Sequence, residues 1–144
     1  MCLVKLSKEK LVEQPYYFKL ITEDYEPLYY HFSGKKYVFN HWLKADYFSD
    51  TEYVDVFDGK GNKYVSGFHC FLSIMEAITY GGSMDIYSKN IAICQGRNVL
   101  AYGCDMYNIR VVVFEYVKLI GFAIKARYIL EDFIDEGEFC HAKL

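Results

Sequence analysis

The segment 109-IRVVVFEYVKLI-120 decides the fold prediction for this chain. Its run from Val111 to Phe114 is uninterrupted and consists of β-branched and aromatic residues, which is typical of a central strand buried on both faces. Two further strands are predicted before it, at residues 91–94 and 99–104. Turn-forming residues separate these three strands, at 95–98 and 105–108.

The first part of the chain is also rich in strand-forming residues. Residues 16–42 carry many aromatic and β-branched side chains, broken by turn residues, and predict two or three short strands. Residues 53–57 and 63–68 flank the turn Asp58-Gly59-Lys60-Gly61-Asn62, whose glycines suit positive φ angles. This arrangement predicts a β-hairpin.

One short helix is predicted near the middle of the chain. Ser73 and Glu76 have the spacing of a capping box, and Gly81-Gly82 supplies a stop. Ile74, Ala77 and Ile78 would then share one face and pack against the sheet.

A second helix is predicted beyond Gly121, ending near Gly137. Apolar residues recur there at helical spacing: Phe122, Ala126, Ile129, Leu130 and Phe133. The chain is therefore predicted to be a single α+β domain over residues 1–144. It would consist mainly of an antiparallel twisted sheet, with one short central helix and a C-terminal amphipathic helix.

The composition supports one buried core and limits the partners. The chain has 144 residues, of which 53% are hydrophobic, with 15 Tyr and 11 Phe. A formal net charge of −3 gives no overall attraction for nucleic acid, so nucleic acid is not expected as a partner. Arg110, Glu115 and Lys118 interrupt the apolar residues 109–124, which therefore do not predict a membrane span. We expect a cytoplasmic protein with no membrane partner.

His69 is the main candidate for ligand binding. It follows Phe68 where a strand meets the predicted helix, and it can hydrogen-bond a ligand or satisfy backbone groups nearby. Tyr80 and Tyr102 are the tyrosines expected beside it if the ligand is a nucleotide. Cys70 is adjacent, but neighbouring residues on a strand point to opposite faces, so the pair does not predict a catalytic dyad.

No catalytic residues, metal site or cofactor motif are predicted. Cys140-His141 has no second pair at the spacing of a zinc site, and no Walker pattern is present.

Negative charge gathers at the end of the predicted C-terminal helix, where a partner with a basic surface could bind. A solvated acidic tail is the alternative. The residues concerned are Glu131, Asp132, Asp135 and Glu136.

Two short motifs carry a resemblance to other proteins. Met1-Cys2-Leu3-Val4-Lys5 and Gly67-Phe68-His69-Cys70-Phe71, followed by Ala77, resemble a loose group of small phage and mobile-element proteins. In that group an MCL-like start and a GFHSF-like motif precede a short helix. The resemblance covers residues 1–120 and implies a bacterial cytoplasm in which viral or mobile-element genes are active.

Three functions remain open at this point. The leading hypothesis is a non-enzymatic interaction protein of phage or mobile-element type. It would bind and inhibit a host protein, such as one of antiviral defence, through Tyr-rich sheet surface and the acidic helix. The second is a nucleotide-binding or nucleotide-modifying domain with a pocket near His69. The third is a homo-oligomeric structural protein that uses the apolar residues 109–124 and the C-terminal helix as its interface.

Overall fold

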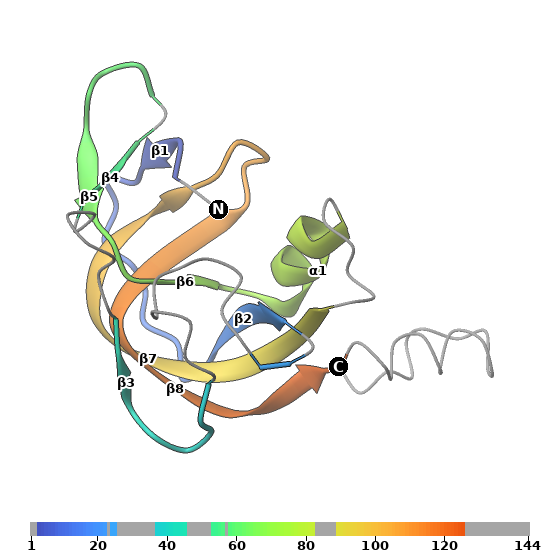
Figure 1. The fold of residues 1–144 in the computed structure, drawn as a ribbon. Helices are drawn as coiled ribbons and strands as arrows, with labels where there is room; N and C mark the ends of the chain where they lie inside the picture. The colour runs from blue at the N-terminus through green and yellow to red at the C-terminus, as the bar shows by residue number, and fades with distance from the viewer. Residues whose placement is uncertain are drawn as a thin grey trace.

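The computed structural model describes residues 3–22, 24–25, 37–45, 53–56, 58–82 and 89–125. The elements within these ranges are β1 (Lys5–Leu6), β2 (Tyr17–Thr22), β3 (Leu43–Lys44), β4 (Tyr53–Asp55), β5 (Lys63–Val65), β6 (Phe68–Phe71), α1 (Ile74–Gly82), β7 (Lys89–Cys104) and β8 (Arg110–Ile124) (Figure 1). Each strand pairing between them is antiparallel. A mainly antiparallel sheet with one short helix is therefore confirmed.

The predicted C-terminal helix is not supported. Its first residues, Phe122 to Ile124, belong to strand β8, which pairs with β7 as far as Ile124. The strand continues because β7 offers hydrogen-bonding partners up to that point, and tertiary pairing overrides the helical spacing. The remainder of the predicted helix, from residue 126 onward, lies outside the described residues.

Four strands close into a ring of pairings, which we call the barrel. β7 pairs with both β8 and β2, and β6 joins β2 to β8. The closure depends on Phe18 of β2, which is aligned with Phe71 of β6. The short strand β1 pairs with β7, and the short strand β3 pairs with β8. Figure 1 shows β7 and β8 as long, strongly curved strands that wrap around the others.

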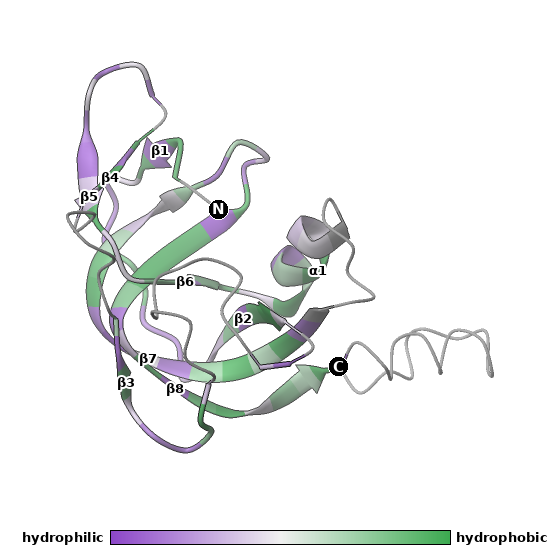
Figure 2. Ribbon diagram, viewed as in Figure 1, coloured by the Kyte–Doolittle hydropathy of each residue, from purple (hydrophilic) through white to green (hydrophobic). Residues whose placement is uncertain are grey.

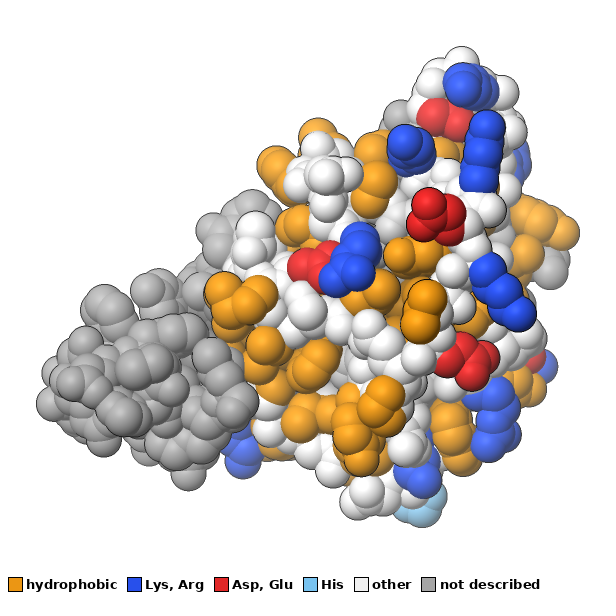
Figure 3. All heavy atoms as spheres, turned by 180° about the vertical axis from the view of Figure 1, so that it is seen from behind, with side chains coloured by type: hydrophobic (Ala, Val, Ile, Leu, Met, Phe, Trp, Pro, Cys, Tyr) orange, Lys and Arg blue, Asp and Glu red, His pale blue; other side chains and the backbone are white. Residues whose placement is uncertain are grey.

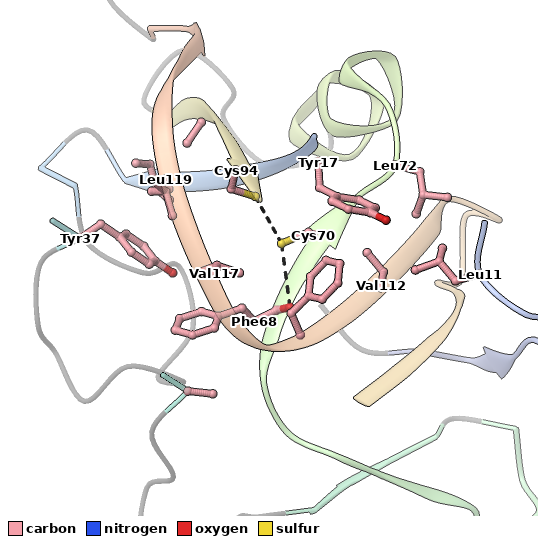
Figure 4. Packing of buried hydrophobic residues seen from close by; sticks show 14 residues of the cluster. Leu11, Tyr17, Tyr37, Phe68, Cys70, Leu72, Cys94, Val112, Val117 and Leu119 are labelled. Carbon is pink, nitrogen blue, oxygen red and sulfur yellow. Dashed lines mark hydrogen bonds between the residues drawn. The ribbon is translucent and has the colours of Figure 1, made fainter. Parts of the chain in front are cut away.

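The interior of the barrel is filled by one hydrophobic cluster, which we call the interior cluster. It includes Tyr17, Cys70, Cys94 and Val112, one from each barrel strand. Strands β6 and β7 are not neighbours in the sheet, yet Sγ of Cys70 lies 3.7 Å from Sγ of Cys94. These side chains therefore meet across the ring rather than along its wall (Figure 4).

A second cluster, which we call the outer cluster, lies on the other face of the same strands. Helix α1 contributes Ala77 to it, and the β4–β5 hairpin contributes Tyr64, so both elements cover this face. Strand β8 feeds both clusters, because Val111 and Val113 belong to the outer one and Val112 to the interior one. All three valines are fully buried, which confirms the predicted central strand. Figure 2 shows that β8 is hydrophobic along most of its length.

Helix α1 begins at the predicted cap. The amide of Glu76 donates to Oγ of Ser73 over 3.1 Å, and this hydroxyl donates in turn to Oε1 of Glu76 over 3.0 Å. Ala77 is fully buried, and Ile74 and Ile78 pack against the outer cluster. The predicted cap and the predicted packing face are both confirmed.

Strand β7 corrects the prediction of two strands separated by a turn at 95–98. It runs from Lys89 to Cys104, and residues 95–97 stay aligned with residues 116–118 of β8. The turn-forming residues bend the strand instead. Asn98 adopts a φ of 61°, and the pairing with β8 shifts register between Val99 and Ala101. A β-bulge therefore replaces the predicted turn.

The predicted β-hairpin at residues 53–68 is present in shorter form. β4 and β5 pair with Tyr53 aligned to Val65, and Gly59 and Gly61 in the connecting turn both have a φ of 73°. The side chain of Asp58 accepts a hydrogen bond from the Lys60 amide over 2.8 Å and holds the turn.

Within the part of the chain described here, no helix has the length and apolar character needed to cross a membrane.

Candidate functional site

A pocket of about 450 Å³ lies beside the bend of β7, and we call it the β7 pocket. Strand β7 pairs with β2 as far as Cys94, and the carbonyl of Tyr102 accepts the amide of Ser7 near β1. Between these points, the pocket is lined by Lys10, Leu11, Glu13 and Gln14 of segment 10–14 and by residues 96–99 of β7. The pocket therefore occupies the place where the described strands leave this side of β7 uncovered.

Two aromatic rings from the interior cluster form part of the pocket lining. The rings of Tyr17 and Phe114 meet edge to face, with their centroids 4.9 Å apart. Gly96 makes room for this arrangement, because a Cβ on Gly96 would overlap the ring of Phe114. The Tyr17 hydroxyl accepts the amide of Gln14 over 3.0 Å, which holds segment 10–14 against the barrel.

Cationic side chains stand at the same pocket. Lys10 and Arg97 belong to its lining, and the guanidinium of Arg97 lies 4.1 Å from the centre of the Trp42 ring. Nζ of Lys118 lies 5.7 Å from that ring, so Trp42 contacts two cations. Asn98 donates from Nδ2 to Oε2 of Glu115 over 2.9 Å and ties the bend of β7 to β8. Arg97 is thereby presented from an ordered strand.

Exposed apolar side chains accompany the pocket on both of its lining segments. Val12 is 82% exposed on segment 10–14, and Val99 is exposed on β7. Tyr16, just beyond segment 10–14, is exposed as well. On the rear face of the molecule, hydrophobic side chains are interspersed with charges of both signs (Figure 3). Aromatic, apolar and cationic groups gathered around one pocket are suited to holding a ligand by contact and charge.

His69 is buried, with only 2% of its surface exposed. Nδ1 lies 3.1 Å from the carbonyl oxygen of Gly67, and Nε2 lies 2.9 Å from the Tyr64 hydroxyl. Because a carbonyl only accepts, Nδ1 carries a proton; in the neutral ring the Tyr64 hydroxyl then donates to Nε2. The structure thus gives both ring nitrogens of His69 a structural partner.

The three residues predicted to surround a nucleotide have different surroundings. Tyr80 is buried on α1 and packs against Phe71, with the ring centres 5.3 Å apart. Tyr102 lines a small hollow of about 170 Å³ with Lys5 and Arg110, and the lining of that hollow contains neither His69 nor Tyr80. The acidic residues expected to bind a partner, Glu131, Asp132, Asp135 and Glu136, lie outside the described residues.

The sequence did not single out the residues of the β7 pocket. The sequence predicts a turn at residues 95–98 and no element at residues 10–14. The available signal is the cation Arg97, which stands between Gly96 and Asn98. Among the described residues, no three His, Cys, Asp or Glu side chains are grouped so as to hold a metal ion.

Comparisons with protein-family models, with curated proteins and with solved structures found no match for this chain. The lining of the β7 pocket indicates which chemical groups a ligand would meet. That pocket offers aromatic rings at Tyr17 and Phe114 and positive charge at Lys10 and Arg97. It also offers amide groups at Gln14 and Asn98.

Proposed function

We propose that the chain is a non-enzymatic interaction protein of phage or mobile-element type that binds and inhibits a host protein through the β7 pocket. The observation that carries the binding role is this 450 Å³ pocket, which is lined by Tyr17, Phe114 and the exposed Val99. The host setting, such as a protein of antiviral defence, follows from the resemblance of residues 1–5 and 67–71 to phage proteins.

Burial of apolar surface at the β7 pocket would supply the affinity. Binding energy at protein interfaces is concentrated in a few aromatic, arginine and apolar anchors that enter well-packed pockets. Val99 lines the pocket and is 41% exposed in the free chain, so it would lose contact with water when a partner side chain enters the pocket. The pocket therefore suits one apolar or aromatic anchor residue of a partner.

The charges around the pocket indicate the chemistry of the partner. Lys10 and Arg97 line it and Lys118 stands at Trp42, whereas Glu13 is the acidic member of the lining. A partner with acidic side chains beside its anchor residue would complement this excess of positive charge. We expect its association rate to fall as the salt concentration rises, because exposed charges are screened.

The test is a pull-down from bacterial lysate with the wild-type chain and two variants. Val99→Asp places a charge in the pocket lining, whereas Met75→Asp places the same charge on α1, where Met75 is 59% exposed. A partner that binds at the pocket should be lost with Val99→Asp and kept with Met75→Asp. Titration calorimetry with the purified partner, before and after neutralising its acidic residues, then measures the charge contribution.

Two results would contradict the proposal. Equal capture by both variants would place the interface elsewhere on the chain. A nucleotide released from the purified protein by denaturation, without a protein partner, would favour the nucleotide-binding alternative. Size-exclusion chromatography with light scattering distinguishes the third alternative, because a self-associating structural protein would form oligomers in the absence of lysate.

A further inference from the structure

The barrel interior contains two thiols in direct contact. Cys70 comes from β6 and Cys94 from β7, and their Sγ atoms lie 3.7 Å apart, with both residues fully buried. Figure 4 shows the two sulfur atoms near the centre of the interior cluster, between Tyr17 and Tyr37. A disulfide needs a sulfur–sulfur distance of about 2.05 Å, so the two sulfur atoms must approach each other by roughly 1.7 Å for the bond to form.

A buried cation accompanies this thiol pair. Lys19 is 8% exposed and lies on the same face of β2 as Tyr17 and Ile21, which are both members of the interior cluster. Its Nζ donates to the carbonyl of His69 over 2.9 Å and lies 5.7 Å from the centre of the Phe68 ring. A nearby negative charge stabilises a buried ammonium group, and a thiolate can supply that charge.

The thiols differ in their readiness to ionise. Burial raises the pKa of Cys70, but the hydrogen bond with Cys94 and the charge of Lys19 together hold that pKa below its ordinary value. The same hydrogen bond and burial raise the pKa of Cys94 well above its ordinary value. Cys70 is therefore the thiol that becomes the nucleophile, and Cys94 the one that keeps its proton.

We propose that Cys70 and Cys94 are an oxidation site that forms a reversible disulfide across the barrel, with Lys19 as the positioning residue that favours the Cys70 thiolate. The oxidant is a small peroxide. The Cys70 thiolate attacks one peroxide oxygen, the O–O bond breaks, and Cys70 becomes a sulfenic acid as hydroxide leaves. Cys94 then attacks the Cys70 sulfur, and the sulfenic oxygen departs with the Cys94 proton as water.

The β7 pocket is a hollow whose lining includes residues of the interior cluster. Tyr17, which lines the pocket, is aligned with Cys94 in the pairing of β2 with β7. Tyr17 also belongs to the interior cluster together with Cys70 and Cys94, so it connects the pocket lining to the cluster that contains the thiols. Formation of the disulfide requires no partner protein.

The test oxidises the full chain with hydrogen peroxide and maps its disulfides by mass spectrometry of non-reduced peptides. Cys2, Cys104 and Cys140 are replaced by Ser, so that Cys70 and Cys94 are the cysteines that remain. We expect one Cys70–Cys94 linkage, a loss of two hydrogen masses, full reversal by dithiothreitol, and a higher melting temperature for the oxidised form. Sulfinic acid at Cys70 without a linkage would overturn the proposal.

The role of Lys19 has its own readout. Lys19→Met should slow disulfide formation severalfold near neutral pH and shift the pH profile of Cys70 alkylation upward, because the thiolate loses its cation. Lys63→Met, at an exposed position on β5, is the matched control and should leave both unchanged. If the pH profile of Cys70 alkylation is unchanged in a folded Lys19→Met protein, Lys19 does not favour the Cys70 thiolate.

Discussion

Oε1 of Glu76 lies 2.6 Å from Nη2 of Arg110 and joins the first turn of α1 to the first residue of β8. The other carboxylate oxygen accepts the backbone amide of Arg110 over 2.8 Å. We expect Glu76→Gln to lower the free energy of unfolding by about 1–2 kcal/mol, because a neutral amide loses charge-assisted hydrogen bonds. Urea unfolding measures the loss. Asp55→Asn removes a solvent-exposed ion pair with Lys63 and should change little.

The same carboxylate makes the stability depend on acid. Burial raises the pKa of Glu76, but the hydrogen bonds from Arg110 and Ser73 outweigh burial and hold the pKa below its ordinary value of 4.5. A group with a lowered pKa stabilises the fold above its ordinary pKa and loses that contribution as the pH falls through the lowered value. The difference in the free energy of unfolding between wild type and Glu76→Gln should therefore have its full size near neutral pH and vanish in strong acid. A difference that persists in strong acid would contradict this assignment.

Gly96 is expected to be intolerant of any side chain. Since its Cβ would overlap the ring of Phe114, Gly96→Ala must displace that ring from Tyr17 and alter the lining of the β7 pocket. We expect a loss of about 1–3 kcal/mol in the free energy of unfolding, together with weaker partner binding. Gly121→Ala is the control, because a Cβ there meets no atom within 4 Å. Equal effects of the two substitutions would argue against the packing explanation.

Replacing the buried Lys19 by Met should not weaken the fold. Burial lowers the pKa of Lys19, and the negative charges of Cys70 and Cys94 offset only part of this effect. The stability of the wild type should therefore rise with pH between the lowered pKa and the ordinary value of 10.5, as the amine loses its charge. Near neutral pH, the free energy of unfolding of Lys19→Met should equal or exceed that of the wild type. The variant should also lack the rise of stability with pH that the Lys19 amine causes in the wild type. Urea unfolding over this pH range tests both statements, and a loss of more than about 2 kcal/mol would contradict them.

Trp42 is the chain's single tryptophan, and it contacts the pocket residue Arg97. Its fluorescence should therefore report changes at the β7 pocket. We expect Arg97→Ala to change the emission maximum and to increase quenching by iodide, because removal of the guanidinium uncovers the indole ring. Lys63→Ala, on the β4–β5 hairpin, should leave the emission unchanged. Identical spectra for Arg97→Ala and the wild type would show that the contact is not maintained in solution.

Local patterns in the sequence were sufficient for several elements. Val111 to Phe114 predicted the central strand because such a run is stable only where both faces are buried. Ser73 and Glu76 predicted the start of α1 because a capping box acts within one turn. In each case the residues that carry the signal are the residues that make the structure.

The other features arise from contacts between distant segments. The ring closes through Phe18 and Phe71, which are far apart in the sequence and carry no local mark of their pairing. Residues 95–98 have turn chemistry, but β8 pairs opposite most of them, so the chain bends without turning back. The β7 pocket results from that bend and from segment 10–14, and for this reason no single motif predicted it.

The arrangement of the short strands also bears on aggregation. Long strands with uncovered backbone groups at a sheet edge are templates for pairing with other chains. β1 and β3 cover parts of the edges of β7 and β8, but the edge of β7 beside the β7 pocket has no described strand along it. Lys10 and Glu13 lie at this edge, and their charges disfavour pairing of the edge with a strand of another chain. The pocket that the proposed partner would enter is thus also the place where charged side chains oppose self-association of the protein.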